Sequence, residues 1–111
     1  KRYPDQPQLA LALARLLAAS PDDRVRDGRR ALAIVQELFK SHKSTDLGET
    51  MAMTLAELGD YQQAAAIQRG VIAAATQKGT KDSLRRMTEN LRLYERRQPC
   101  RTPWRADELM Q

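Results

Sequence analysis

The fold of this chain is decided by one stretch, which reads Leu55-Ala56-Glu57-Leu58-Gly59-Asp60-Tyr61-Gln62-Gln63-Ala64. Gly59 can adopt the left-handed backbone conformation that ends many helices. Asp60 is a residue type that begins helices, because its carboxylate accepts a hydrogen bond from a free backbone N–H in the first turn. The stretch therefore predicts that one helix ends and the next begins within two residues.

Apolar residues at spacings of three and four extend this pattern in both directions and predict five helices. Their expected ranges are about 6–19, 27–41, 46–58, 61–77 and 81–97. Asp27 is the expected N-cap of the second helix. Gly70 lies inside the fourth helix, where it costs about 1 kcal/mol relative to Ala, and this cost predicts tight packing at that position. One last helical turn is expected to run through Leu109, with Trp104 folded back as an anchor.

The composition agrees with a helical domain. The chain has 111 residues, of which 41% are hydrophobic and 30% charged, which is typical of one globular domain and excludes general disorder. It has only five glycines and five aromatic residues (one Trp, three Tyr and one Phe), which argues against a strand-rich fold. No stretch approaches the ~18 apolar residues of a membrane span. The first residue is Lys1 and no signal peptide follows, so we expect a fragment of a longer protein.

No motif in the sequence predicts catalysis. The chain contains a single cysteine, Cys100, and a single histidine, His42, which excludes metal sites built from several of these residues. We expect His42 to be an exposed or capping loop residue. Cys100 is expected to be a passive thiol in a tail, although Arg97 and Arg101 beside it could lower its pKa. The sequence therefore predicts no enzyme activity, no cofactor and no metal.

An internal repeat supports a hairpin architecture. Aligning Ala31 with Ala64, 33 residues later, also superposes positions 35 and 38 on 68 and 71. The stretch at 55–64 resembles the centre of a tetratricopeptide repeat (TPR), whose period is 34 residues. In that resemblance Ala52 occupies the position of the small packing residue and Ala64 that of the helix-crossing alanine.

The resemblance implies an all-α fold of TPR-like antiparallel helical hairpins: two helix pairs and a C-terminal capping helix, arranged as a right-handed solenoid. We expect one domain over residues 1–111, with a repeat core at about 8–97 and a tail or short helix at 98–111. The whole looks like the C-terminal repeat region of a larger bacterial protein. Four positions depart from the family pattern. Gly48 replaces the usual Trp, Met51 the usual Leu and Gln68 the usual aromatic residue, and Thr76 stands where Pro often ends the unit.

The resemblance also implies a protein–protein interaction or scaffolding module, in which the first helix of each pair lines a concave groove. Carried over by position, the groove residues are Gln8, Leu11, Arg15, Asp46, Glu49, Met53, Glu57, Arg85, Glu89 and Arg92. Asp46, Glu49 and Glu57 are expected to share one surface with Met53 between them. Such a surface favours a partner segment that carries Lys or Arg beside an apolar anchor.

Three alternatives stay open at this point. The domain could be a non-catalytic cap of a longer solenoid, or an accessory domain of a larger bacterial enzyme. A nucleic-acid-associated helical domain is less favoured, because the net charge of +5 is divided between the two ends of the chain and most bases have an acid nearby. Homo-oligomers are compatible with the sequence, which does not distinguish between cytoplasm and periplasm.

Overall fold

A computed structural model of the chain describes residues 7–41, 44–78 and 81–102. These residues form five α-helices and no strand: α1 (Pro7–Ala19), α2 (Gly28–Phe39), α3 (Thr45–Glu57), α4 (Tyr61–Lys78) and α5 (Lys81–Glu95). The all-α fold and the five helices are confirmed, and no helix end differs from its expected position by more than two residues. The expected last turn, with Trp104, lies outside the described residues. None of the helices in the described part combines the length and the apolar character that crossing a membrane requires.

Local capping explains where the helices begin and end. The Asp27 carboxylate accepts a hydrogen bond from the backbone N–H of Arg30, and Asp60 does the same for Gln63. Gly59 has φ of 90°, in the left-handed region, so the expected turn between α3 and α4 is confirmed. Ser44, which the sequence analysis did not single out, caps α3 by accepting from the N–H of Leu47.

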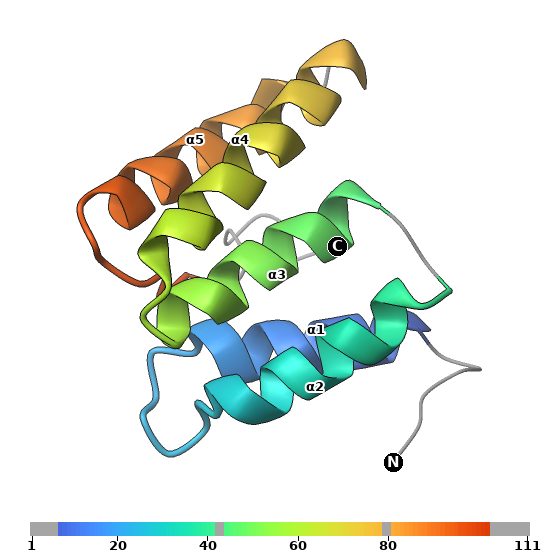
Figure 1. The fold of residues 1–111 in the computed structure, drawn as a ribbon, viewed down its shortest axis with the longest axis vertical. Coiled ribbons are helices and arrows are strands. Elements are labelled where there is room, and N and C mark those ends of the chain that lie inside the picture. Colours follow the sequence, from blue (N-terminus) through green and yellow to red (C-terminus); the bar gives the residue numbers. More distant parts are fainter. Residues whose placement is uncertain (1–6, 42–43, 79–80, 103–111) are drawn as a thin grey trace.

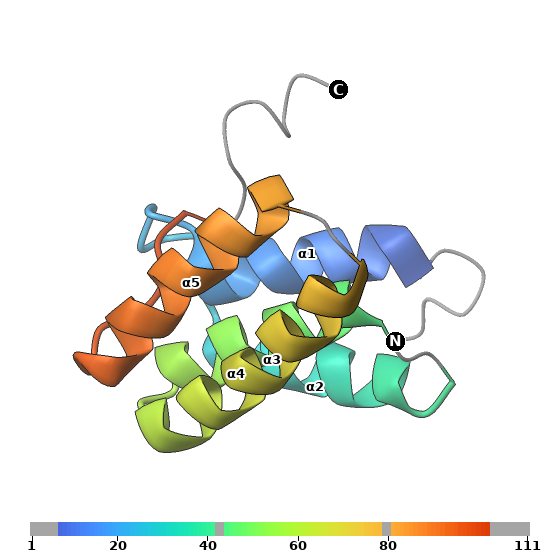
Figure 2. The ribbon, with the colours of Figure 1, turned by 90° about the horizontal axis from the view of Figure 1, so that it is seen from above.

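Consecutive helices run antiparallel, and α3 lies at the centre of the arrangement (Figures 1 and 2). It packs against α1, α2 and α4, while α5 packs mainly against α4. The Cα radius of gyration is 12.9 Å, close to the ~13 Å of a compact domain of about 100 residues. The described residues therefore form one compact five-helix unit.

Small side chains allow the helices to approach closely. The fully buried alanines include Ala14, Ala18, Ala31, Ala52, Ala56 and Ala64. Between α3 and α4 there is little free space at Gly48, where an added Cβ would lie 2.9 Å from the Cγ2 of Val71. The leucines of α1 recur at helical spacing, which predicts that they form its packing face. Leu9 and Leu16 are nevertheless exposed, because the alanines of that helix face the core.

The expected tight packing at Gly70 is wrong, because nothing lies within 4 Å of a Cβ added there. Gly70→Ala should therefore stabilise the protein by about 0.5–1 kcal/mol, since alanine forms helices better than glycine.

Gly59→Ala should destabilise the protein by about 1 kcal/mol, because alanine is strained at positive φ. Urea unfolding followed by circular dichroism measures both changes. A stabilised Gly59→Ala variant would contradict the turn described above.

Candidate interaction site

Three charged side chains from three helices meet in the interior. Glu49 of α3 is fully buried and accepts hydrogen bonds from Arg86 of α5, with Nη2–Oε1 at 2.7 Å and Nε–Oε2 at 3.0 Å. Arg15 of α1 places its Nη2 at 3.2 Å from Oε1 of the same carboxylate, and its Nε donates to Thr50 Oγ1 at 3.2 Å. Buried charges are tolerated only when paired and hydrogen-bonded. The Arg15–Glu49–Arg86 cluster therefore joins α1, α3 and α5 at one place.

Asn90 and Tyr94 continue this polar cluster along α5, at spacings of four residues from Arg86. Both side chains are almost completely buried. Burial raises the pKa of the Tyr94 phenol, and Glu49 and Cys100 act on it in the same direction. The Tyr94 hydroxyl and the Asn90 Nδ2 have no hydrogen-bond partner among the described residues. Two potential donors thus lie beneath the surface of this cluster without an acceptor.

After α5 the chain turns back over the cluster. Arg97 has φ of 61°, and the N–H groups of Arg97 and Gln98 donate to the carbonyls of Tyr94 and Leu93. The Arg97 guanidinium lies 5.6 Å from the ring centroid of Tyr61. Residues 98–102, which we call the strap, then run from the end of α5 toward the loop between α1 and α2 (Figures 1 and 2).

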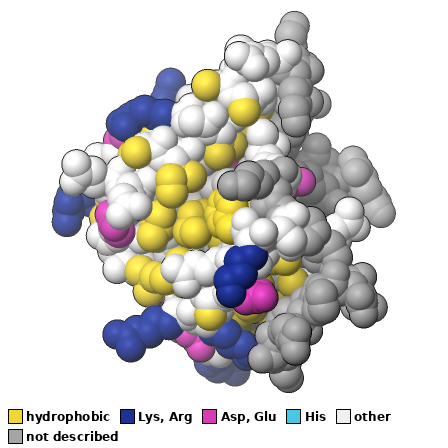
Figure 3. All heavy atoms as spheres, turned by 45° about the vertical axis from the view of Figure 1, so that its right-hand side comes forward, with side chains coloured by type: hydrophobic (Ala, Val, Ile, Leu, Met, Phe, Trp, Pro, Cys, Tyr) yellow, Lys and Arg dark blue, Asp and Glu magenta, His cyan; other side chains and the backbone are white. Residues whose placement is uncertain are grey.

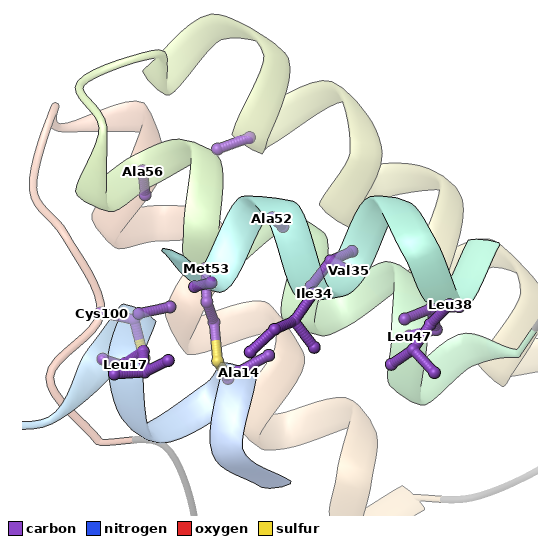
Figure 4. Close-up of a cluster of buried hydrophobic side chains, with 14 of the residues drawn as sticks. Ala14, Leu17, Ile34, Val35, Leu38, Leu47, Ala52, Met53, Ala56 and Cys100 are labelled. Carbon is purple, nitrogen blue, oxygen red and sulfur yellow. The ribbon is translucent and has the colours of Figure 1, made fainter. Parts of the chain in front are cut away.

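Cys100 is the buried anchor of the strap. It is 1% exposed and lies beside Leu17, with Met53 close by (Figure 4). Its Sγ donates to Asn90 Oδ1 at 3.6 Å and to the Thr102 carbonyl at 3.5 Å. Burial raises the pKa of the Cys100 thiol. The expected position in a tail is therefore wrong, because the residue packs into the core, and the suggestion that Arg97 and Arg101 lower the pKa of the thiol is wrong as well.

Arg101 is the charged contact of the strap. Its Nη1 lies 2.9 Å from Oε1 of Glu57, at the end of α3, and the Arg101 side chain is 33% exposed. Glu57 also forms an ion pair with Arg26, whose Nε is 3.5 Å from Oε2. The Arg26 side chain in turn donates to the carbonyl of Ser20 at 2.7 Å. Glu57 thus connects the strap to the loop between α1 and α2.

The ten expected groove residues do not form one exposed surface. Arg15, Glu49 and Met53 are buried, Leu11 and Glu57 are half-buried, and Gln8, Asp46, Arg85, Glu89 and Arg92 are exposed. The structure brings Arg15 and Glu49 into contact but leaves Asp46 on the surface. The physical reason is that Arg15, Glu49 and Met53 are buried between the helices and that the strap covers part of the face of α1, α3 and α5.

The sequence analysis missed Arg86 and Asn90, which lie on the inward face of α5 together with Tyr94. It assigned Arg85, Glu89 and Arg92 to the groove instead. The spacing of four residues from 86 to 90 to 94 was a signal, because such residues lie on one helix face, the one that also holds Met87. A shift of one residue takes the expected groove positions 85 and 89 to the buried positions 86 and 90.

Other features of the described residues add little chemistry. No group of three His, Cys, Asp or Glu side chains within that part of the chain is placed to hold a metal ion. His42 lies outside the described residues. Hydrophobic side chains gather in the middle of the face on which α2, α3 and α4 lie (Figure 3). Half-buried apolar residues of these helices include Phe39, Met51, Leu55 and Ile67.

Comparison with known proteins gives no relative: no protein-family model, no curated protein and no solved structure matches this chain.

Proposed function

We propose that this chain is a non-catalytic protein-interaction module that holds an extended peptide segment on the face shared by α1, α3 and α5. The observation that carries the proposal is the strap. Its residues 98–102 lie on that face as a non-helical segment, with one small buried side chain, Cys100, and one ion pair, between Arg101 and Glu57. The face is therefore able to hold a segment with a small anchor beside an arginine.

A finer proposal concerns the architecture. We propose that α1–α2 and α3–α4 are TPR-like hairpins and that α5 is a capping helix. The left-handed Gly59 and the complete burial of Ala52 and Ala64 support this reading, because the resemblance expects small residues and a turn at these positions. In the resemblance, alternate helices line the binding face, and the ion cluster that joins α1, α3 and α5 agrees with such a lining.

Glu57 is the residue on which to test this function. It is half-buried and contacts the strap, whereas Glu49 is fully buried, so a charge reversal at Glu49 would disturb folding before it disturbed binding. We expect a library of displayed random 12-residue segments, selected on the full chain, to enrich segments with Lys or Arg beside a small residue. Glu57→Lys should abolish this enrichment, because it places like charges against each other.

Glu37→Lys is the matched control, since it makes the same charge change at an exposed position of α2. It should retain the enrichment, and circular dichroism should show that both variants are folded. Selection of no segment would contradict the interaction function and favour a purely capping or accessory domain. Retention of duplex DNA with a steep loss of affinity in salt would instead favour the nucleic-acid alternative.

A further inference from the structure

We propose that the strap is an intramolecular occupant of this site, which a partner segment displaces, and that the preferred partner carries a small hydroxyl or amide residue followed by arginine. This inference rests on the proposed function and adds its regulation and the chemistry of the partner. It follows from two features of the structure: how weakly the strap is held, and which polar groups it leaves without an acceptor.

The strap is held by few contacts. Among the described residues, no backbone–backbone hydrogen bond joins residues 99–102 to any helix or loop. The strap has one fully buried side chain, that of Cys100, while Arg101 is partly exposed and Thr102 is exposed. Segments with few buried contacts and few backbone hydrogen bonds open at a lower free-energy cost than the whole fold. The strap can therefore open while the five helices stay packed.

The strap also fits its site imperfectly. Cys100 packs against Asn90 and lies close enough to Tyr94 to add to the rise that burial causes in the pKa of the Tyr94 phenol. Yet the Tyr94 hydroxyl and the Asn90 Nδ2 are left without an acceptor among the described residues. Buried donors without acceptors are unfavourable, and a thiol is a weak acceptor. The Cys100 Sγ lies 3.6 Å from Asn90 Oδ1, on the same amide as the unpartnered Nδ2. A serine, threonine or asparagine in place of the thiol would add a strong acceptor oxygen next to this amide.

The charge of the partner follows from Glu57. In the closed strap this carboxylate is paired with Arg101, and it lies at the edge of the site where it is 20% exposed. Arginine suits a carboxylate better than lysine does, because its planar guanidinium can form two parallel hydrogen bonds. A displacing segment therefore needs an arginine directly after the small anchor, as the strap itself has.

Cys100 provides a direct measure of strap opening, because it is the single cysteine of the chain and is 1% exposed. The rate at which N-ethylmaleimide labels the full chain reports the open fraction. Arg101→Glu should accelerate labelling about fivefold to tenfold, since it replaces an ion pair with a repulsion. Arg96→Glu, an exposed position for which no ion pair is described, should leave the rate unchanged.

Two properties of this measurement make it specific. A negative charge beside Cys100 raises the pKa of the thiol and by itself slows labelling, so acceleration has to come from opening. Labelling through strap opening should also depend only weakly on urea, because little surface becomes exposed, whereas labelling through global unfolding depends steeply on urea. The proposal would be overturned if the parent chain, Arg101→Glu and Arg96→Glu were labelled at equal rates and with a steep dependence on urea. The strap would then open only when the whole domain unfolds.

Displacement is tested with hexapeptides added to the Arg101→Glu chain. The probe is Arg-Gln-Pro-Ser-Arg-Thr, which repeats residues 97–102 with serine in place of Cys100. Because a tethered segment competes at an effective concentration in the millimolar range, the peptide is used up to about 10 mM. It should accelerate labelling saturably and at lower concentration than the alanine version, whereas a version with glutamate for the second arginine should have no effect.

The outcomes separate this inference from the function on which it rests. If the display selection enriches basic segments but none of the hexapeptides accelerates labelling, the interaction function stands and the strap is not its competitor. If the serine and alanine peptides act equally, the assignment of an oxygen-bearing anchor is wrong. If selection enriches nothing while labelling behaves as expected, the strap opens but the interaction function fails.

Discussion

Glu49→Ala should lower the free energy of unfolding by about 3–5 kcal/mol, the largest effect we expect from a single substitution in this chain. The carboxylate is fully buried and accepts hydrogen bonds from both Arg15 and Arg86. Removing it leaves two guanidinium groups in the interior without the negative charge that they share. Alanine is a good helix former, so the loss cannot be assigned to the helix propensity of α3.

Urea unfolding followed by circular dichroism measures this loss, with Glu37→Ala as the matched control. Glu37 is exposed on α2 and pairs only with Lys40 among the described residues, so its replacement should change stability by less than about 0.5 kcal/mol. Equal small losses in both variants would show that Glu49 is hydrated, and that α1, α3 and α5 do not meet at a buried carboxylate.

Ala64→Leu should lower the free energy of unfolding by about 1–3 kcal/mol, because added methylene groups do not fit a closely packed helix contact. Ala64 is fully buried in the core, and α4 packs there against α3. The control is Ala66→Leu, two residues away on the exposed side of α4, which should be nearly neutral. If Ala64→Leu melts at the same temperature as the parent chain, α3 and α4 are not closely packed at Ala64.

Much of the fold could be predicted because its determinants are local. Gly59 at positive φ and the caps Asp27 and Asp60 act within a few residues of themselves, so their roles could be read from short stretches. The buried face of α4 was predictable in part. Of the residues that recur there at helical spacing, Ala64, Ala65, Gln68, Val71 and Ala75 are buried, whereas Ile67 and Ile72 are half-buried. The Gln68 side chain is fully buried, and its Nε2 donates to the carbonyl of Met87 at 2.9 Å.

The candidate site was harder to predict, because its contacts join residues far apart in the chain. Arg15 and Glu49 are 34 residues apart, and Glu49 and Arg86 are 37 residues apart. Sequence patterns treat charged side chains as solvent-facing, which is correct for most of them. A charged side chain is buried here because partners from other helices lie within hydrogen-bonding distance of it. The sequence pattern of a single helix does not reveal such partners.

By itself, the sequence determined that this protein is a set of five helices with defined ends, since hydrogen bonding within a helix and capping at its ends depend on neighbouring residues. Only the tertiary structure decided which side chains of those helices are inside. In the structure Glu49 is buried between Arg15 and Arg86, and Cys100, which was expected in a tail, is buried in the core. Next to it, Arg101 pairs with Glu57. The physical reason is that burial and charge pairing are properties of the assembled surfaces of several elements, which form only when the helices pack together.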